Sequence, residues 1–365
     1  MYIGFQPDFM LKLAEKPAMC CHRDNHNMRL PLETIAPKTI GIAAAVVTIV
    51  IWTSFIVIAR FMALKGLTPL DIVLCRFVGA ALILLPWGYF MVRKMRLNNA
   101  GYRASQTWLG LSPLPLRITV LIGTFGGVAY AVLAYSAFVY APAAHGSVLL
   151  PGMLPLSTAL FSVWLLRERL RGGRITGLAM IFGGAMLVGG VSIFNALLHP
   201  FDSEAGSRVY IGDILFVCAS TCWAFYAVTC RKHALGAVPA TIAVIVFCVI
   251  TFIPAYGVLV WLGVLHSKLA TAPWSEIIFH TIWQGGGSVV ISGITFTKMV
   301  EYFGPVRTTM LTAVVPGLSA LGAVVFLNEP LYWNLIAGLL LVTLGIVVGV
   351  RASGKSAAVL VAAKA

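Results

Sequence analysis

The sequence predicts an all-α polytopic membrane protein with ten transmembrane helices arranged as two inverted five-helix repeats. Three observations support this fold class: apolar runs of span length, a one-sided distribution of basic residues, and an internal duplication. Of the 365 residues, 59% are hydrophobic and only 10% are charged, whereas soluble domains carry roughly 25% charged residues. This composition excludes a soluble enzyme, a disordered chain and a coiled coil.

Ten apolar segments are long enough to cross a hydrocarbon core, which takes about 20 helical residues. The eighth is the least regular, because Gln284 and the glycine triplet 285–287 interrupt it. The predicted spans are 40–59, 69–90, 117–139, 143–165, 174–194, 211–230, 239–263, 275–297, 305–327 and 333–350.

The basic residues predict the orientation of these spans. With the N-terminus inside, 21 Lys and Arg fall on the inner side, 4 fall on the outer side and Arg76 alone lies within a span. Cytoplasmic loops are enriched in Lys and Arg, so both termini are predicted to be cytoplasmic. The net charge of +14 is then a signal of topology, and we expect no nucleic-acid partner.

An internal duplication divides the chain into two halves. A shift of 161 residues gives 11 identities over the 34 positions from Pro155 to 188 without a gap. An offset of 171 relates the first helix to the sixth. The aligned pairs include Pro155 with Pro316, Glu168 with Glu329, Gly177 with Gly338, Gly184 with Gly345, Trp52 with Trp223, and Arg60 with Arg231.

Each half contains five spans, an odd number, so the second half enters the membrane with the opposite orientation. Inverted repeats are the architecture of many secondary transporters, whose binding sites lie near the midplane between the halves. The predicted units are a polar, disordered cytoplasmic tail (1–38), the first repeat (39–195), a periplasmic linker (196–210), the second repeat (211–351) and a cytoplasmic tail (352–365).

The N-terminal tail lacks the order of basic region, apolar core and small-residue cleavage site that marks a cleavable signal peptide, and Met28 is an alternative start of the native chain. No standard metal-binding spacing is present, since Cys20, Cys21, His22 and His26 fit no common zinc site. Walker A, serine-hydrolase and HExxH motifs are also missing. We therefore expect no cofactor, no metal and no catalytic residue.

Four stretches of the two halves form recognisable motifs: Trp52 to Arg60, Pro69 with Arg76-Phe77, Pro155 to Leu170, and Pro316 to Leu331. In these stretches the chain resembles the drug/metabolite transporter superfamily, specifically its EamA branch of ten-helix bacterial inner-membrane carriers. The resemblance covers about residues 38–351 and departs at the glycine triplet and the long tail. It implies a gradient-coupled carrier, often an exporter, of amino acids or other small metabolites.

Arg76 is the leading candidate for substrate binding. It lies seven residues after Pro69, about 10 Å along a helix, and a charge at that depth should face the bundle interior. Its guanidinium would anchor a carboxylate or phosphate. The alternative is a structural partner or a cap on backbone carbonyls.

Other polar and aromatic residues have both functional and structural interpretations. Glu168 and Glu329 are candidates for proton relays or for symmetry-related salt bridges at span ends. The glycine triplet, centred on Gly286, would either expose backbone to a substrate or allow close packing, and Pro155 and Pro316 are candidate hinges. The remaining candidate binding residues are Trp52, Tyr130, His145, Trp223, Tyr226, Gln284 and Ser288, with Tyr135 as a further cavity-lining aromatic.

The sequence thus predicts an alternating-access exporter of small organic metabolites in the bacterial inner membrane. Its partners are a small-molecule substrate and the lipid bilayer, with the proton as a candidate coupling ion. A membrane-embedded lipid-processing enzyme and a channel remain as alternatives.

Overall fold

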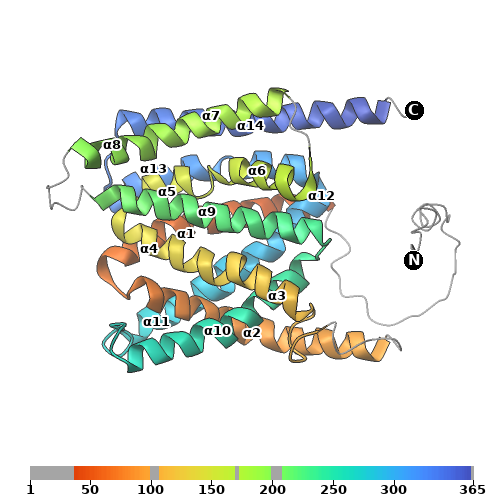
Figure 1. The fold of residues 1–365 in the computed structure, drawn as a ribbon, viewed down its shortest axis with the longest axis vertical. Coiled ribbons are helices and arrows are strands. Elements are labelled where there is room, and N and C mark those ends of the chain that lie inside the picture. The colour runs from red at the N-terminus through yellow and green to blue at the C-terminus, as the bar shows by residue number, and fades with distance from the viewer. Residues whose placement is uncertain (1–36, 99–106, 169–171, 199–207, 363–365) are drawn as a thin grey trace, which may run out of the picture. The chain divides into compact units, whose positions relative to one another are not determined.

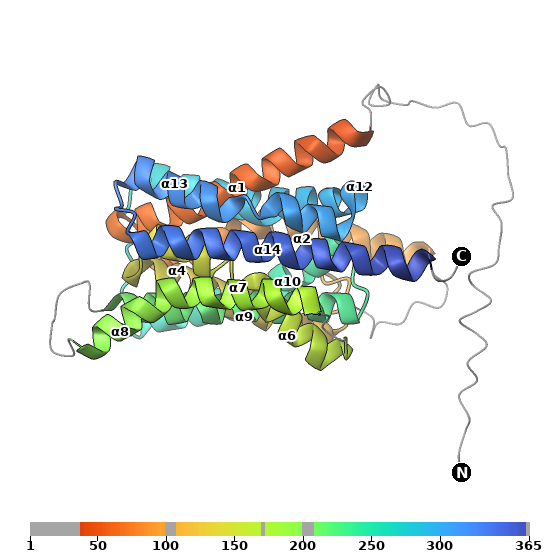
Figure 2. The ribbon, with the colours of Figure 1, turned by 90° about the horizontal axis from the view of Figure 1, so that it is seen from above.

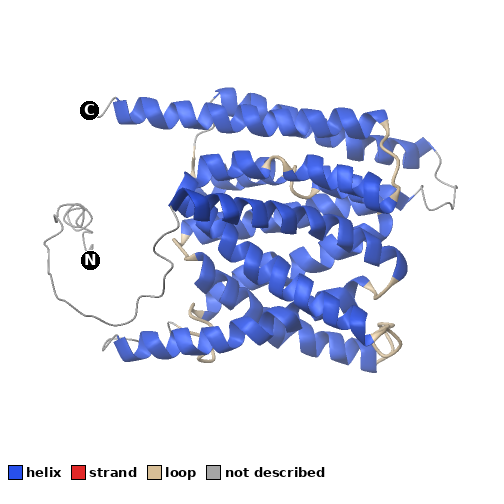
Figure 3. Cartoon of the chain, turned by 180° about the vertical axis from the view of Figure 1, so that it is seen from behind, coloured by secondary structure: helices blue, strands red, loops and turns tan. Residues whose placement is uncertain are grey.

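The computed structural model describes residues 37–98, 107–168, 172–198 and 208–362, and these parts of the chain form helices and short connections without a strand (Figures 1 and 3). The predicted N-terminal tail lies almost entirely outside the described residues. The helices of the first half, with π-helical segments written η, are α1 (Pro37–Lys65), α2 (Pro69–Asn98), α3 (Leu116–Gly123), η3 (Thr124–Ala129), α4 (Tyr130–Tyr140), α5 (Ala143–Leu149), α6 (Leu154–Leu166), α7 (Gly172–Ala185), η4 (Met186–Gly190) and α8 (Val191–Leu198).

The second half repeats this order with small differences. Its helices are α9 (Val209–Lys232), α10 (Ala237–Trp261), α11 (Trp274–His280), η6 (Thr281–Ile291), α12 (Ser292–Thr312), α13 (Val315–Leu327) and α14 (Trp333–Ala362). α14 continues into the segment predicted as a tail, because its Ala- and Val-rich continuation is compatible with a helix.

Eight helical stretches of the described chain are long and apolar enough to cross a membrane, and Val315–Leu327 and Trp333–Gly349 are two shorter apolar helices. Together they correspond to the ten predicted segments. The predicted eighth span is continuous, since α11, η6 and α12 follow one another without a break. The glycine triplet widens this helix into a π-helix; it does not unwind it.

The predicted fourth and ninth spans are each divided in the middle. In the fourth span, α5 ends at Leu149 and α6 begins at Leu154. In the ninth span, which is predicted to start at residue 305, α12 ends at Thr312 and α13 begins at Val315. Proline lacks the N–H that continues a helix, so it is tolerated in the first turn. Pro155 and Pro316 both occupy that position, directly after the two breaks.

Helices of one half pack mainly against helices of the other. α1 contacts α12 and α13, and its repeat partner α9 contacts α4 and α6. Likewise α2 packs on η6, while α10 packs on α3 and η3. In Figure 1 these helices run horizontally between two ends. We call the end where α1 finishes the Arg60 end (left) and the end where α9 finishes the Arg231 end (right).

The fifth and tenth helices form a separate pair, and Figures 1 and 2 both show α7 beside α14. Glycines of α7 contact glycines of α14 that are not their repeat partners. A Cβ on Gly177 would lie 2.6 Å from the carbonyl oxygen of Gly345, and one on Gly184 would lie 2.6 Å from that of Gly338. Since Gly177 and Gly184 are the repeat partners of Gly338 and Gly345, this exchange of partners is what an inverted repeat requires.

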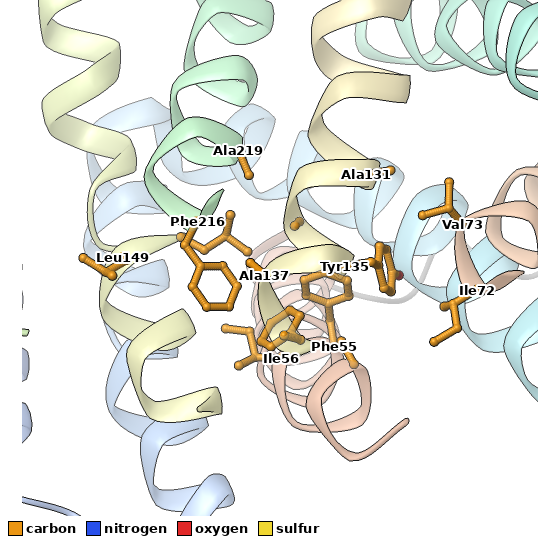
Figure 4. Packing of buried hydrophobic residues seen from close by; sticks show 14 of the residues in the cluster. Phe55, Ile56, Ile72, Val73, Ala131, Tyr135, Ala137, Leu149, Phe216 and Ala219 are labelled. Atoms are coloured by element: carbon orange, nitrogen blue, oxygen red, sulfur yellow. The ribbon is translucent and has the colours of Figure 1, made fainter. Parts of the chain in front are cut away.

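Aromatic and small side chains fill the core between the halves (Figure 4). Phe55 contacts Tyr135 edge to face with ring centroids 5.6 Å apart, and Phe138 contacts Phe216 at 4.7 Å. Tyr135, Phe138 and Phe216 are at most 1% exposed. This packing fixes α1, α4 and α9 around the residues described next.

The glycine contacts predict a position-specific effect on stability. Gly184→Ala should lower the free energy of unfolding by about 1–3 kcal/mol, because the new methyl group meets a backbone carbonyl that cannot move aside. Its chain neighbour Gly183 has no atom closer than 3.4 Å to an added Cβ, so Gly183→Ala is the matched control. Thermal unfolding in detergent measures both, and equal effects would contradict the packing described.

Candidate functional site

A buried polar network joins both halves around Arg76. The Arg76 side chain projects from α2 and its Nη1 donates hydrogen bonds to the hydroxyl oxygens of Ser288, at 3.0 Å, and Tyr135, at 3.3 Å. The Tyr135 hydroxyl in turn donates to Oε1 of Gln284 at 2.7 Å. Arg76 is 7% exposed, Tyr135 1% and Gln284 0%. The network is therefore closed to solvent in this conformation.

The charge of Arg76 is not matched by a carboxylate among the described residues. Its neighbours are hydroxyl groups and two aromatic rings, with the guanidinium carbon 5.8 Å from the Phe55 ring centroid and 6.0 Å from that of Tyr135. Such cation–π contacts contribute roughly 0.5–2 kcal/mol each. Desolvating a charge costs several kcal/mol, so the aromatic cage leaves the guanidinium suited to an anionic ligand.

The nearest acidic residue on α2 does not pair with Arg76. Asp71 and Thr68 form a reciprocal cap at the start of α2, with Thr68 N donating to Asp71 and Asp71 N donating to the Thr68 hydroxyl. Asp71 also accepts bonds from the Tyr256 hydroxyl and the Lys268 backbone N–H. These bonds use the Asp71 carboxylate to hold the loops that contain Thr68 and Lys268 at the Arg60 end.

The π-helical segment η6 sets the position of Gln284 and Ser288. Gly285 packs directly on α2, where an added Cβ would lie 2.5 Å from Ala80 N. Gly286 and Gly287 have no atom closer than 3.8 Å to an added Cβ. Only Gly285 is thus required for the close approach of η6 to α2. The wider turn of a π-helix is often found at functional sites.

The aromatic candidates Trp52 and Trp223 lie in two separate aromatic groups. Trp223 lies against Tyr130, with centroids 4.7 Å apart, and against Tyr226, at 5.1 Å. Trp52 instead stacks on Phe296 at 5.3 Å. The two repeat-related tryptophans therefore occupy different environments, and the structure does not bring all the predicted aromatics to one site.

His145 forms a second buried polar cluster. Its Nδ1 lies 2.8 Å from Oδ1 of Asp213, whose other oxygen accepts a bond from the Ser192 hydroxyl. The exposed fractions are 8% for His145 and 2% for Asp213. Sequence reasoning did not single out Asp213; its position as an acidic residue inside the sixth span was the signal that would have found it.

Glu168 and Glu329 each pair with an arginine of the opposite half. Arg60 Nε lies 3.0 Å from Glu329, and Arg231 Nη2 lies 2.5 Å from Glu168. Because Arg60 aligns with Arg231 and Glu168 with Glu329, the two bridges are exchanged by the repeat symmetry. One holds the Arg60 end and the other holds the Arg231 end.

The two bridges differ in burial. At the Arg60 end the Arg60 and Glu329 side chains are 13% and 11% exposed, Arg60 also donates to the Phe138 carbonyl, and Ala144 N contacts Glu329. At the Arg231 end the Arg231 and Glu168 side chains are 63% and 28% exposed. Exposed pairs contribute about 1 kcal/mol or less, and the bridge at the Arg60 end is the one that is better shielded from solvent.

Comparison with known proteins gives consistent matches along the chain. The model of the EamA-like transporter family matches residues 39–190 and 210–351. An uncharacterized transporter of Clostridium kluyveri is 22% identical over 321 residues, covering 87% of this chain and 94% of the relative. A WAT1-related protein of Arabidopsis thaliana is 23% identical over 292 residues, covering 77% and 79%.

The fold is also similar to that of a solved protein. A protein crystal structure that is 21% identical superposes with a TM-score of 0.53, covering 86% of this chain and 96% of that one. At this level of identity the similarity concerns the fold alone.

Proposed function

Because the chain belongs to the EamA-like transporter family, we propose that it is a secondary active transporter that exports small organic metabolites carrying an anionic group. The observation that carries the proposal is Arg76, a buried guanidinium held by neutral groups of both halves. An anion bound there would satisfy its charge. Transport would occur by alternating access across the bacterial inner membrane, with both termini in the cytoplasm and the two repeats (39–195 and 211–351) moving against each other.

The two salt bridges support alternating access. Each joins the halves at one end of the bundle, and the symmetry that exchanges the bridges also exchanges the ends. A conformation that opens the Arg60 end would break the Arg60–Glu329 bridge while burying the Arg231–Glu168 bridge. The described conformation, with the better shielded bridge at its Arg60 end, corresponds on the predicted orientation to a state closed toward the periplasm.

The site does not favour the alternative functions. A lipid-processing enzyme would need converging nucleophiles or acid–base groups at one interface, whereas Arg76 is surrounded by hydroxyls, an amide and aromatic rings. A channel would need a continuous path, and the Arg76 network is closed. Product formation in detergent would identify an enzyme, and single-channel currents would identify a channel.

Substitution of Arg76 tests the proposed site. Arg76→Ala should reduce counterflow of a labelled carboxylate into preloaded liposomes at least tenfold, because it removes the only cation of the network, and Arg76→Lys should retain part of the activity. Arg93→Ala is the control, since Arg93 is an exposed arginine at the end of the same helix. Normal counterflow by folded Arg76→Ala protein would contradict the proposal.

We further propose that the proton is the coupling ion and that the His145–Asp213 pair binds it. This pair is buried between α5 and α9, its neighbour Ser192 bonds the same carboxylate, and Ala144 beside His145 contacts Glu329 of the Arg60–Glu329 bridge. A change in protonation of the pair is therefore placed to affect the Arg60 end.

Proton coupling predicts a separation of two transport activities. His145→Gln and Asp213→Asn should abolish accumulation driven by an imposed proton gradient, while counterflow exchange, which needs no gradient, should persist within about threefold. His266→Gln, an exposed histidine outside the cluster, should leave both activities unchanged. Gradient-driven accumulation by the Asp213→Asn variant would contradict this assignment.

A further inference from the structure

Unpartnered polar atoms are concentrated in one short stretch beside the Arg76 network. In the described residues, eight buried side-chain nitrogen and oxygen atoms have no hydrogen-bond partner. Four of them lie within residues 280–284: both ring nitrogens of His280, Nε1 of Trp283 and Nε2 of Gln284. The other four are single hydroxyl oxygens, on Thr53, Thr107, Ser162 and Ser220.

These two groups of atoms differ chemically. A hydroxyl group can rotate toward a nearby backbone carbonyl, so its partner is easily restored. The polar atoms of an imidazole, an indole or a side-chain amide point in fixed directions, and each needs a partner that lies along its own direction. A buried polar group without a partner calls for an explanation, such as a functional role. Among the described residues, the stretch 280–284 contains all of the buried side-chain nitrogens that have no hydrogen-bond partner.

The unpartnered side chains face the interior. His280 and Gln284 are both 0% exposed, whereas Ile282 between them is 66% exposed. Four residues of helix correspond to a rise of about 6 Å, so His280 lies roughly one turn from Gln284 toward the Arg60 end. Gln284 in turn is linked through Tyr135 to Arg76. The polar atoms thus extend the Arg76 network in one direction.

A shallow hollow opens near the outer limit of this extension. It has a volume of about 380 Å³ and is lined in part by Glu276 and Phe279, which immediately precede His280 in the helix. The fully buried His280 ring is therefore next in the chain to an open surface at the Arg60 end. This placement suits a group that meets a ligand between that surface and Arg76.

The charges around the extension restrict the ligand that fits it. Gln284 Nε2 and Trp283 Nε1 are donors only, and a neutral imidazole adds one donor and one acceptor. The two carboxylates of the adjoining elements have other roles, because Asp71 bonds Tyr256 and Lys268 N while Glu276 bonds Leu67 N. A ligand oxygen would find donors at His280, Trp283 and Gln284, whereas the carboxylate of Glu276 lies one helical turn farther out, at the hollow.

We infer that His280 and Gln284 form a second arm of the substrate site, selecting carboxylic acids that carry an uncharged hydroxyl or carbonyl oxygen over zwitterionic amino acids. This inference rests on the proposed transport function and on the anion-binding role of Arg76. It departs from the amino-acid substrates that the family resemblance implies. The carboxylate would bind Arg76, and the hydroxyl or carbonyl oxygen would accept hydrogen bonds from Gln284 and His280.

Variants separate a binding role from a structural one. His280→Phe removes two unpartnered ring nitrogens and keeps the bulk of the ring, whereas Gln284→Leu removes the unpartnered Nε2 together with Oε1, which accepts the Tyr135 hydrogen bond. A structural histidine would lose stability on replacement, whereas removal of unpartnered nitrogens should leave the unliganded melting temperature of His280→Phe unchanged or raised. Gln284→Leu should lower the melting temperature, because the buried Tyr135 hydroxyl loses its acceptor. Ser220→Ala is the matched control, because it removes an unpartnered hydroxyl from α9, away from the Arg76 network.

The test uses carbon-matched acids that differ only beside the carboxylate. Pyruvate, lactate and alanine form one set, and phenylpyruvate, phenyllactate and phenylalanine form the other. Thermal unfolding of the purified protein should show stabilisation by the keto or hydroxy acid of at least one set. The amino acid of that set should bind at least tenfold more weakly. Gln284→Leu and His280→Phe should each weaken binding of the preferred acid about tenfold, and Ser220→Ala should not.

The outcomes distinguish this inference from the proposed function. Preferential binding of the amino acids, or full affinity in both Gln284→Leu and His280→Phe, would overturn the inference and leave a carrier with an Arg76 anchor. Failure of all six compounds to bind would also overturn it. Loss of counterflow for every solute, with binding intact, would instead contradict the proposed transport function.

Discussion

The packing of each half against the other is the constraint on which the rest of the structure depends. Close contacts between the halves occur in exchanged pairs: Gly177 with Gly345 and Gly184 with Gly338, and likewise the two arginine–glutamate bridges. The proposed alternating access uses this arrangement, because the same contacts could be redistributed between the two ends. The two bridges are unequally buried in the described conformation, with the Arg60–Glu329 bridge the more buried.

The polar core departs from this symmetry. Arg76 has an apolar counterpart in the second half, where Ile245, Val246 and Cys248 are buried in α10. His280, Trp283 and Gln284 belong to the second half alone. The scaffold is thus duplicated, whereas the candidate site around Arg76 is not. Buried unpartnered groups lower stability, and four of the eight in the described chain lie within residues 280–284.

The sequence predicted much of the fold, because apolar length, basic loops and an in-frame duplication are each set by the bilayer or by the repeat. The resemblance to the EamA branch is confirmed by the family match. The divided fourth and ninth helices were not predicted, since Pro155 and Pro316 are tolerated at the start of a helix as readily as in a kink. Arg76 stood out because it is the one basic residue inside a span. The contacts between helices could not be derived from a single sequence. For this reason the sequence did not identify Tyr135 and Ser288 as partners of Arg76, nor the roles of Asp213 and His280.

Cross-linking across the two bridges tests alternating access most directly. In a cysteine-free protein, paired cysteines replace Arg60 and Glu329, or Arg231 and Glu168, and a reducible bifunctional thiol reagent of salt-bridge length joins them. Either cross-link should stop counterflow and reduction should restore it, with a monofunctional reagent as the control. Transport that continues while the Arg60 end is covalently closed would contradict the account.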